Sequence, residues 1–420
     1  MRTTRSESTL CKNKTFCRVC GGRRLETVIS LGAMPPANAF TKKEKQNVPE
    51  LLFPLACTFC HACGFVGLLD IVSPELLFGN YVYVSSTSPT FVAHFEEFAG
   101  SVSQRFAFPA GSLILDIGSN DGILLRPFKG RGWRVLGVDP ATAIAAQANE
   151  NGITTIPAFF TPGLAHTVRV TSGKAHVISA TSVFPHIDDL DSVIAGVKDL
   201  LHDNGVFIIE AYYLPDIVEK RLFDTIYHEH LSYFTVKTLA TLLARLGMEM
   251  FDAEKTDTHG GSLRAFIQKK NGPHTICAAV AQFIANENRA RMGDIETFRA
   301  FARTIEENKR NLTGLLSDLK RQEKRIAAYG AAAKGNTLLN YFGIGADVIS
   351  YVVDDSPWKQ GLYTPGMKIP VVAAEALESM PPDYLLILAW NFAEPIMRKC
   401  SAFRERGGKF IIPVPEPRIA

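Results

Sequence analysis

The segment Leu113-Ile-Leu-Asp116-Ile-Gly118-Ser119-Asn120-Asp121-Gly122 is an apolar strand that runs into a glycine-containing turn. A helical pattern starts at Ile123, and a second strand over residues 134–138 ends at Asp139. Glycines let the backbone approach a ligand, and an acid after the second strand can accept both ribose hydroxyls. The segment therefore predicts a nucleoside-binding turn at the carboxyl edge of a parallel sheet.

The sequence around this turn alternates between strands and helices. Further strands are expected over residues 176–180 and 205–211, with helical patterns between them. A charged helical stretch over 278–325 leads into a second strand, turn and helix over 325–335, followed by strands over 348–353, 385–390 and 409–413. Such alternation indicates an α/β fold with two doubly wound, mostly parallel sheets in tandem.

Cysteines are concentrated at the start of the chain, where six of the eight lie within the first 63 residues. The pairs Cys17-x-x-Cys20 and Cys60-x-x-Cys63 have the spacing of a tetrahedral zinc site. Four thiolates leave no open position for substrate, so this Zn²⁺ is expected to be structural. Free buried thiols are the alternative interpretation.

A neighbouring cysteine, Cys57, competes with Cys60 for the role of ligand. We favour Cys60 because Gly64 follows its pair as Gly21 follows the first pair. Both glycines fit the tight turn that a zinc knuckle requires. Cys11 and Cys57 are then expected to be free thiols.

Length and composition limit the class of protein. At 420 residues the chain is expected to hold two or three domains, and its 46% hydrophobic and 21% charged residues are typical of a folded globular protein. A net charge of only +3 argues against a nucleic-acid surface and leaves room for a small anionic ligand. No apolar run approaches the roughly 18 residues of a membrane span, and the first residues lack a signal peptide's apolar stretch, so we expect a soluble cytoplasmic protein.

The densest group of titratable side chains is Tyr227-His228-Glu229-His230. On a helix the two histidines would diverge by about 200°, so chelation on one helical face is disfavoured, although on a loop or strand they could bind a metal together. Histidine suits proton removal next to a carbonyl at neutral pH, with Glu229 as a neighbouring orienting or electrostatic partner and tyrosines donating to an enolate oxygen. A solvated polar loop is the alternative.

Three other segments could complete a site. Ser182 and His186 follow the strand that ends near residue 180, at the edge where ligands bind. His259-Gly-Gly-Ser-Leu-Arg264 is a glycine turn between an imidazole and a guanidinium, and Lys334 lies in the second strand-to-helix turn, where it could hold a phosphate. Structural roles are the alternative for each.

The first turn also distinguishes between nucleotide cofactors. Its middle position is Asn120 where a dinucleotide site has glycine, and Asp116 and Asp121 are poor neighbours for a pyrophosphate. They suit a cationic sulfonium amino acid. The turn resembles motif I of class I methyltransferases that use S-adenosylmethionine (SAM), which implies cofactor contacts from a set of turn residues and the following acid: Asp116, Gly118, Ser119, Asn120, Asp121, Gly122 and Asp139.

The motifs taken together resemble the C-methyltransferases of deoxysugar biosynthesis, which act on nucleotide-linked 4-keto sugars. Besides the segments already quoted, the resemblance rests on Met34-Pro-Pro-Ala-Asn38-Ala-Phe40, Asn80-Tyr81-Val-Tyr83, Ala328-Tyr-Gly-Ala-Ala-Ala-Lys334-Gly335 and Val353-Asp-Asp-Ser356. It covers nearly the whole chain.

This resemblance implies roles for individual residues. His230 becomes the base and Glu229 its partner, Tyr227 and Tyr81 contact the enolate or substrate, and His186 is a further active-site residue. The substrate-binding candidates are Ser182, Tyr83, His259, Arg264 and Lys334. Ser182 stands where the family has asparagine, in a segment resembling Asn-Val-x-x-His, which leaves the sugar open.

The sequence thus predicts a zinc-binding domain over residues 1–80, a SAM-dependent methyltransferase core over 81–277, and a Rossmann-like, substrate-binding domain with leading helices over 278–420. We expect C-methylation, at C3, of a dTDP- or GDP-linked 4-keto-6-deoxysugar, through an enolate formed by His230. No nucleic acid, membrane or second copy of the chain is required. The alternatives are methylation of RNA or protein, and a non-catalytic zinc- and nucleoside-binding scaffold.

Overall fold

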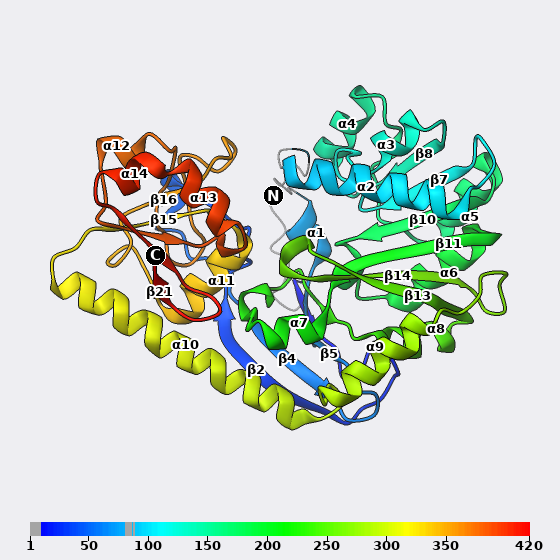
Figure 1. Ribbon diagram of the computed structural model, residues 1–420, viewed down its shortest axis with the longest axis horizontal. Helices are drawn as coiled ribbons and strands as arrows, with labels where there is room; N and C mark the ends of the chain where they lie inside the picture. The colour runs from blue at the N-terminus through cyan, green and yellow to red at the C-terminus, as the bar shows by residue number, and fades with distance from the viewer. Residues whose placement is uncertain (1–9, 80–85, 87–88) are drawn as a thin grey trace, which may run out of the picture.

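The computed structural model of this protein describes residues 10–79, 86 and 89–420, except for the side chain of residue 259. Three units follow one another along the chain (Figure 1). The N-terminal strands run below and between two larger α/β units, the core and the C-terminal domain. Within the described residues, no helix is long and apolar enough to cross a membrane.

The core is built on a seven-stranded sheet in the order β13-β14-β11-β10-β7-β8-β9. Five neighbouring strands, from β11 to β9, are parallel, and β14 is antiparallel to both β11 and β13. The strands are β7 (Leu113–Ile117), β8 (Arg134–Val138), β9 (Thr155–Ile156), β10 (Ala175–Thr181), β11 (Leu201–Tyr212), β13 (Met248–Thr256) and β14 (Ser262–Lys269).

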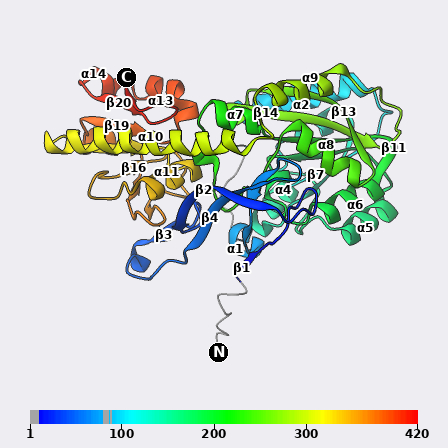
Figure 2. The same ribbon diagram turned by 90° about the horizontal axis from the view of Figure 1, so that it is seen from below.

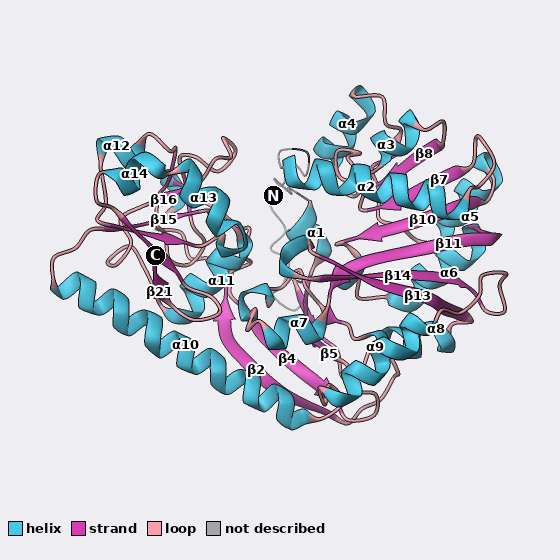
Figure 3. Cartoon of the chain, in the orientation of Figure 1, coloured by secondary structure: helices cyan, strands magenta, loops and turns pink. Residues whose placement is uncertain are grey.

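Helices cover both faces of this sheet, as Figure 3 shows. Leu113, Leu115 and Ile117 of β7 pack in one apolar cluster, whereas Ile114 packs in another on the opposite face. Burial on both faces explains why these strands are apolar without interruption. The helices are α2 (Pro89–Phe106), α3 (Leu125–Gly130), α4 (Thr142–Glu150), α5 (Pro162–Ser172), α6 (Leu190–Leu200), α7 (Leu214–Glu219) and α8 (Val236–Arg245).

The N-terminal unit is a small antiparallel module that contacts both larger units. Its four-stranded sheet, β12-β5-β4-β2, includes β12 (Ser232–Tyr233) from the core, and its β3 pairs with β17 (Leu362–Tyr363) of the C-terminal domain. The remaining elements are β1 (Cys11–Asn13), β2 (Leu25–Met34), β3 (Thr41–Lys42), β4 (Phe53–Cys60), β5 (Val66–Leu68), β6 (Asp70–Val72) and α1 (Pro74–Phe78).

The C-terminal domain has a six-stranded sheet in the order β18-β16-β15-β19-β20-β21, in which only β21 is antiparallel to its neighbour. Its strands are β15 (Ile326–Tyr329), β16 (Val352–Val353), β18 (Val371–Val372), β19 (Tyr384–Ile387), β20 (Lys409–Ile412) and β21 (Arg418–Ile419). Its helices are α11 (Ala333–Phe342), α12 (Ala376–Ser379), α13 (Ala393–Lys399) and α14 (Ser401–Glu405).

Two helices lead into this domain. The long helix α10 (Ile295–Arg321) buries a stripe that includes Phe298, Ile305 and Leu312, and it lies along β2 (Figures 1 and 2). By contrast α9 (Ala278–Arg289) packs against α8 and β13 of the core. The domain boundary predicted at residue 278 places α9 with the C-terminal domain.

The predicted α/β class with two doubly wound sheets is confirmed. The strand over 134–138 has the predicted bounds, whereas the strand predicted over 348–353 is only Val352–Val353. Its first half is a turn, in which the backbone N–H groups of Val348 and Ile349 both donate to the carbonyl of Gly345.

Candidate active site and metal centre

A cavity of about 250 Å³ lies where the carboxyl ends of β7, β10 and β11 face the C-terminal domain. All three units of the chain line it, which is the arrangement expected of a site with two reactants. The polar lining and turn residues include Asn38, Asp116, Gly118, Ser119, Asn120, Thr181, Ser182, His186, Tyr212, Tyr227, His230, Lys334, Lys359 and Asn391.

The glycines of the turn after β7 pack closely against neighbouring side chains. Gly118 has φ +72°, and a Cβ there would lie 2.8 Å from the Val183 side chain. Gly122 has φ +80°, and a Cβ there would lie 2.8 Å from the Ile153 side chain. A side chain at either position would therefore strain the turn and force its neighbours apart. This brings the backbone of residues 118–120 to the cavity wall.

Asp116 is the acid that this turn presents to the cavity. It is buried, it accepts a 2.7 Å hydrogen bond from the Ser179 hydroxyl, and burial raises its pKa to about 7. Asp121 does not line the cavity, because its carboxylate pairs with Arg126 at 3.0 Å. The expectation of two cofactor-facing carboxylates in the turn is thus corrected to one.

Asp139 follows β8 as predicted and holds the turn in place. Its two carboxylate oxygens accept backbone N–H groups of Asn120 and Ala141, each at 2.9 Å. Burial raises the pKa of Asp139, and the two N–H donors oppose that rise. A carboxylate oxygen can accept more than one hydrogen bond, so the ribose role expected of Asp139 is compatible with these contacts.

His230 lies in the cavity wall with one ring nitrogen already engaged. Its Nδ1 is 2.7 Å from the carbonyl oxygen of Thr225, and its ring is 3% exposed as part of a buried loop. A carbonyl oxygen only accepts hydrogen bonds, so Nδ1 carries the proton in this contact. This contact fixes the orientation of the imidazole ring in the cavity wall.

The two residues before His230 turn away from it. Nε2 of His228 donates to the carbonyl of Phe53 at 3.1 Å, which ties the loop to β4 of the N-terminal module. Glu229 accepts a 2.7 Å hydrogen bond from Asn38, and burial raises its pKa to about 7. The contact that orients His230 comes from the carbonyl of Thr225, and an electrostatic role for Glu229 stays a prediction. His228 and His230 bond to the carbonyls of two different segments, Phe53 and Thr225, which disfavours a shared metal.

Aromatic groups surround the His230 ring. The rings of Tyr227, His186 and Tyr212 have centroids 3.8, 5.0 and 5.0 Å from it. Burial lowers the pKa of His186 to about 4, so this imidazole is neutral at pH 7 and places no positive charge beside His230. Ser182 also lines the cavity. Its backbone is in the left-handed region, with φ +59°, and its N–H donates to the backbone carbonyl of Glu210.

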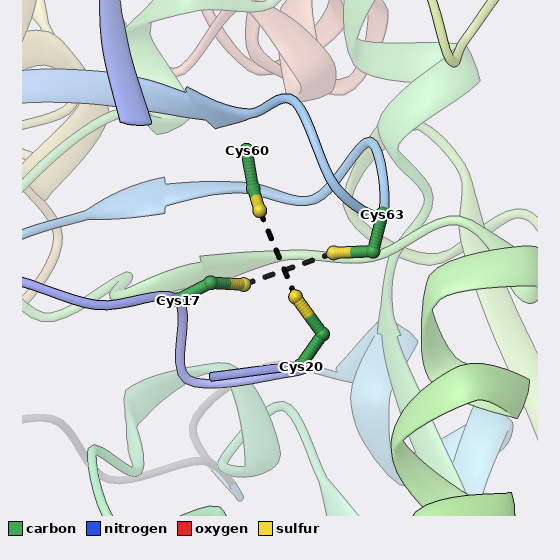
Figure 4. A group of neighbouring side chains, drawn as sticks. All are labelled: Cys17, Cys20, Cys60 and Cys63. Atoms are coloured by element: carbon green, nitrogen blue, oxygen red, sulfur yellow. Dashed lines mark hydrogen bonds between the residues drawn. The ribbon is translucent and has the colours of Figure 1, made fainter. Parts of the chain in front are cut away.

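The predicted zinc ligands converge as a group (Figure 4). One ligand atom from each of Cys17, Cys20, Cys60 and Cys63 lies within 4.8 Å of the others, and the Cys17–Cys63 and Cys20–Cys60 sulfur pairs are each 3.7 Å apart. Zn–S bonds of about 2.3 Å in a tetrahedron place sulfurs about 3.8 Å apart. The four cysteines thus fit a zinc ion.

The two knuckles have matching backbones. Gly21 and Gly64 have φ +74° and +79°, and each donates its N–H to the carbonyl of the first cysteine in its pair at 2.8 Å. Cys57 is buried in β4 outside the cluster, so the preference for Cys60 is confirmed. Arg245 of α8 ties the knuckle to the core by donating to the Val19 carbonyl at 3.0 Å.

Three family models match consecutive stretches of the chain. They describe a zinc binding domain over residues 17–78, a methyltransferase domain over 91–252, and a C-methyltransferase C-terminal domain over 257–415. The C-methyltransferase NovU of Streptomyces niveus is 36% identical over 403 residues, which span 96% of this chain and 96% of NovU. The chain belongs to this family of C-methyltransferases. The resemblance stated from the motifs is confirmed, and the protein is a SAM-dependent C-methyltransferase with an N-terminal zinc-binding domain.

Solved structures of methyltransferases are similar to part of the chain. Magnesium protoporphyrin IX methyltransferase from Synechocystis PCC 6803 with bound SAH is 15% identical, covers 43% of this chain and 83% of its own, and has a TM-score of 0.34. A plantazolicin methyltransferase in complex with SAH has the same identity and coverages and a TM-score of 0.33. The family assignment therefore rests on the sequence matches.

Of the two basic side chains predicted to bind substrate, Lys334 lines the cavity and Arg264 does not. Lys334 is buried at the start of α11 and lines the cavity, with Nζ 5.2 Å from the centre of the Tyr212 ring. Arg264 lies outside the cavity lining, where its guanidinium pairs with Glu210 and Glu254 at 2.8 and 2.9 Å. Two carboxylates already neutralise Arg264, so the C-methyltransferase has Lys334 and not Arg264 at the cavity.

Three of the predicted contacts lie beyond what the structure describes. Tyr81 and Tyr83 are outside the described residues, and the side chain of His259 is not described. Their roles stay predictions from the family resemblance.

Several cavity residues of the C-methyltransferase were not singled out from the sequence. Asn38 was quoted only as part of a motif, and its position before Phe40 gave no sign that it would meet Glu229. Tyr212 ends β11 at the ligand-binding edge, a signal that was available. The carbonyl of Thr225 has no sequence signal at all, because every residue carries one.

Proposed function

We propose that this C-methyltransferase transfers a methyl group from SAM to C3 of a nucleotide-diphosphate 4-keto-6-deoxysugar. The observation that carries the proposal is His230, whose Nδ1–H is bound by the Thr225 carbonyl while its ring borders the cavity beside the Asp116 turn. A C4 ketone acidifies the neighbouring C–H, and a base at that position makes the carbon nucleophilic. The motifs of the sugar C-methyltransferases support the choice of substrate.

Each side chain around the cavity has a separate role in the proposed reaction. Nε2 of His230 takes the proton from C3, and the neutral imidazole of His186 and the phenol of Tyr227 donate to the enolate oxygen. Bound SAM supplies an electrophilic methyl group on its sulfonium sulfur. The core and C-terminal domain enclose the reactants, so the enolate carbon is held close to that methyl group.

The substrate's remaining polar groups have candidate partners on all three units of the chain. Asn38 and Ser182 border the cavity and can meet sugar hydroxyls, and Glu229 orients the Asn38 amide. Lys334 lies at the first turn of α11, where backbone N–H groups and its ammonium favour a diphosphate. Burial lowers the pKa of Lys334, and an adjacent anion favours the charged form.

The four-cysteine cluster is proposed to hold a structural zinc ion. All four ligand positions are filled by thiolates, which leaves none for substrate or water. The module it closes carries Asn38 and the β4 carbonyl that anchors His228. The metal therefore supports the cavity from outside.

A substrate panel tests the proposed function. Purified protein is incubated with methyl-labelled SAM and dTDP- and GDP-linked 4-keto-6-deoxysugars, with the matching 4-hydroxy sugars, ribosomal RNA and bulk protein as further acceptors. We expect label only in a 4-keto sugar, on C3 by NMR. Label in RNA or protein, or equal label in the 4-hydroxy sugars, would contradict the proposal, because an enolate needs the ketone.

The pH dependence of SAM binding tests the role of Asp116. Its pKa of about 7 means that acid protonates it, so we expect the affinity for SAM to fall as pH drops from 8 to 6. Asp116→Asn keeps the Ser179 hydrogen bond but removes the charge, and should raise the Kd at pH 8 about 10- to 100-fold and flatten this pH dependence. Calorimetric titration measures both effects.

Asp121→Asn is the matched control, since its carboxylate lies in the same turn but pairs with Arg126. It should bind SAM with nearly the wild-type pH profile. A flat profile in wild type, or equal losses in the two variants, would remove Asp116 from the cofactor site.

A further inference from the structure

The carbonyl that orients His230 belongs to a short 3-10 turn, Phe223–Thr225, in the core. This turn lies against the C-terminal domain. The Phe223 ring stacks on Phe342 of α11 with centroids 5.1 Å apart and an interplanar angle of 15°. The Thr225 carbonyl, which accepts the hydrogen bond from His230, therefore lies on a segment that packs against the C-terminal domain.

Asp224, at the centre of this turn, makes a polar contact to the same domain. It is fully buried, and its Oδ2 accepts a 2.5 Å hydrogen bond from the indole Nε1 of Trp390. Its other oxygen, Oδ1, is buried without a hydrogen-bond partner among the described residues. Burying an unpaired carboxylate costs folding free energy. Loss of the hydrogen bond from Trp390 would therefore destabilise the turn.

A cation completes the arrangement. Nζ of Lys334 lies 5.1 Å from the centre of the Trp390 ring and attracts the Asp224 carboxylate. Burial raises the pKa of Asp224, whereas Lys334 and the Trp390 N–H oppose that rise. Two residues of the C-terminal domain therefore favour the charged carboxylate on the turn.

We propose that Asp224 is a positioning residue that, through Trp390, fixes the 223–225 turn to the C-terminal domain and so aims Nε2 of His230 into the cavity. This inference rests on the base role proposed for His230. Contact with the C-terminal domain then has two effects. It encloses the substrate, and it orients the imidazole of His230 in the core. Asp224 itself is not among the residues that line the cavity.

The first test reads the His230 ring without any substrate. In protein labelled with 15N-histidine, the His230 signal is assigned by its loss in His230→Asn. Wild type should show the tautomer protonated at Nδ1. Asp224→Ala and Trp390→Phe should shift this signal toward a tautomer mixture, because the carbonyl moves away from Nδ1. An unchanged His230 signal in both variants would overturn the proposal.

The second test is kinetic, with the acceptor identified by the substrate panel. We expect Asp224→Ala to lower kcat about 10- to 100-fold with little change in the Kd for SAM, and Trp390→Phe to act in the same direction. Combined with His230→Asn, Asp224→Ala should cause no further loss, since the group it aims is gone. Losses that multiply in the double variant would indicate a purely structural role and overturn the proposal.

Two controls keep these outcomes separate. Asp318→Asn removes an exposed carboxylate that pairs with Arg321 on α10, and should leave both the His230 signal and kcat unchanged. If His230→Asn is as active as wild type, the proposed function fails, whereas the NMR signal still reports whether Asp224 aims the ring. Trp390→Phe keeps an aromatic ring, so it stays informative if Asp224→Ala does not fold.

Discussion

Replacing His230 by asparagine is expected to lower kcat for methyl transfer about 10³-fold, which corresponds to about 4 kcal/mol of barrier. The asparagine amide N–H can reach the Thr225 carbonyl as Nδ1–H does, but asparagine has no counterpart of Nε2. The loop should therefore stay folded while the proton acceptor is lost. Single-turnover kinetics with labelled SAM measures the chemical step directly.

The matched control is His228→Gln, two residues away in the same loop. Glutamine can keep the N–H contact that Nε2 of His228 makes with the Phe53 carbonyl. We expect this variant to retain most of its kcat, and both variants to bind SAM as wild type does. If His228→Gln loses as much activity as His230→Asn, the loop as a whole matters and His230 is not the base.

Cys60→Ser is expected to have the largest effect on stability. Structural zinc sites contribute about 10–16 kcal/mol of apparent binding free energy in zinc-finger peptides, and that free energy is folding free energy. Losing one thiolate should therefore remove zinc, lower the first melting transition by about 10 °C or more, and expose residues 10–79 to protease. Metal analysis should find one zinc per wild-type chain and much less in the variant.

The expected loss of methyl transfer in Cys60→Ser follows from the module's contacts. Asn38 borders the cavity, and β5 pairs with β12 immediately after His230. Cys11→Ser is the control, since Cys11 lies outside the four-cysteine cluster and should leave zinc content and melting unchanged. Zinc-free wild-type protein that melts and turns over normally would contradict a structural role for the metal.

Local patterns in the sequence were sufficient for the fold class and the metal centre. The two Cys-x-x-Cys pairs fix their own knuckle geometry through the glycines at positions 21 and 64. The strand, glycine turn and acid from Leu113 to Asp139 likewise act within one βαβ segment. These features depend on neighbouring residues and backbone conformation, so spacing and residue type predicted them.

Charge pairing was beyond such patterns. Asp121 and Arg264 both had the residue types of ligand contacts, yet Arg126 and the pair Glu210 and Glu254 neutralise them. The partners of Arg264 lie 54 and 10 residues away in sequence, on neighbouring strands of the sheet. A sequence shows which groups can bind an anion or cation, but not which of them are already paired.

The sequence by itself determined the family, the two α/β sheets, the zinc ligands and the histidine proposed as the base. Only the tertiary structure decided how that histidine is held, because its acceptor is the backbone carbonyl of Thr225, a group that residue type cannot mark. It also decided that Asn38 and Lys334, nearly 300 residues apart, border one cavity. Those contacts depend on the docking of three units, which short-range patterns do not encode.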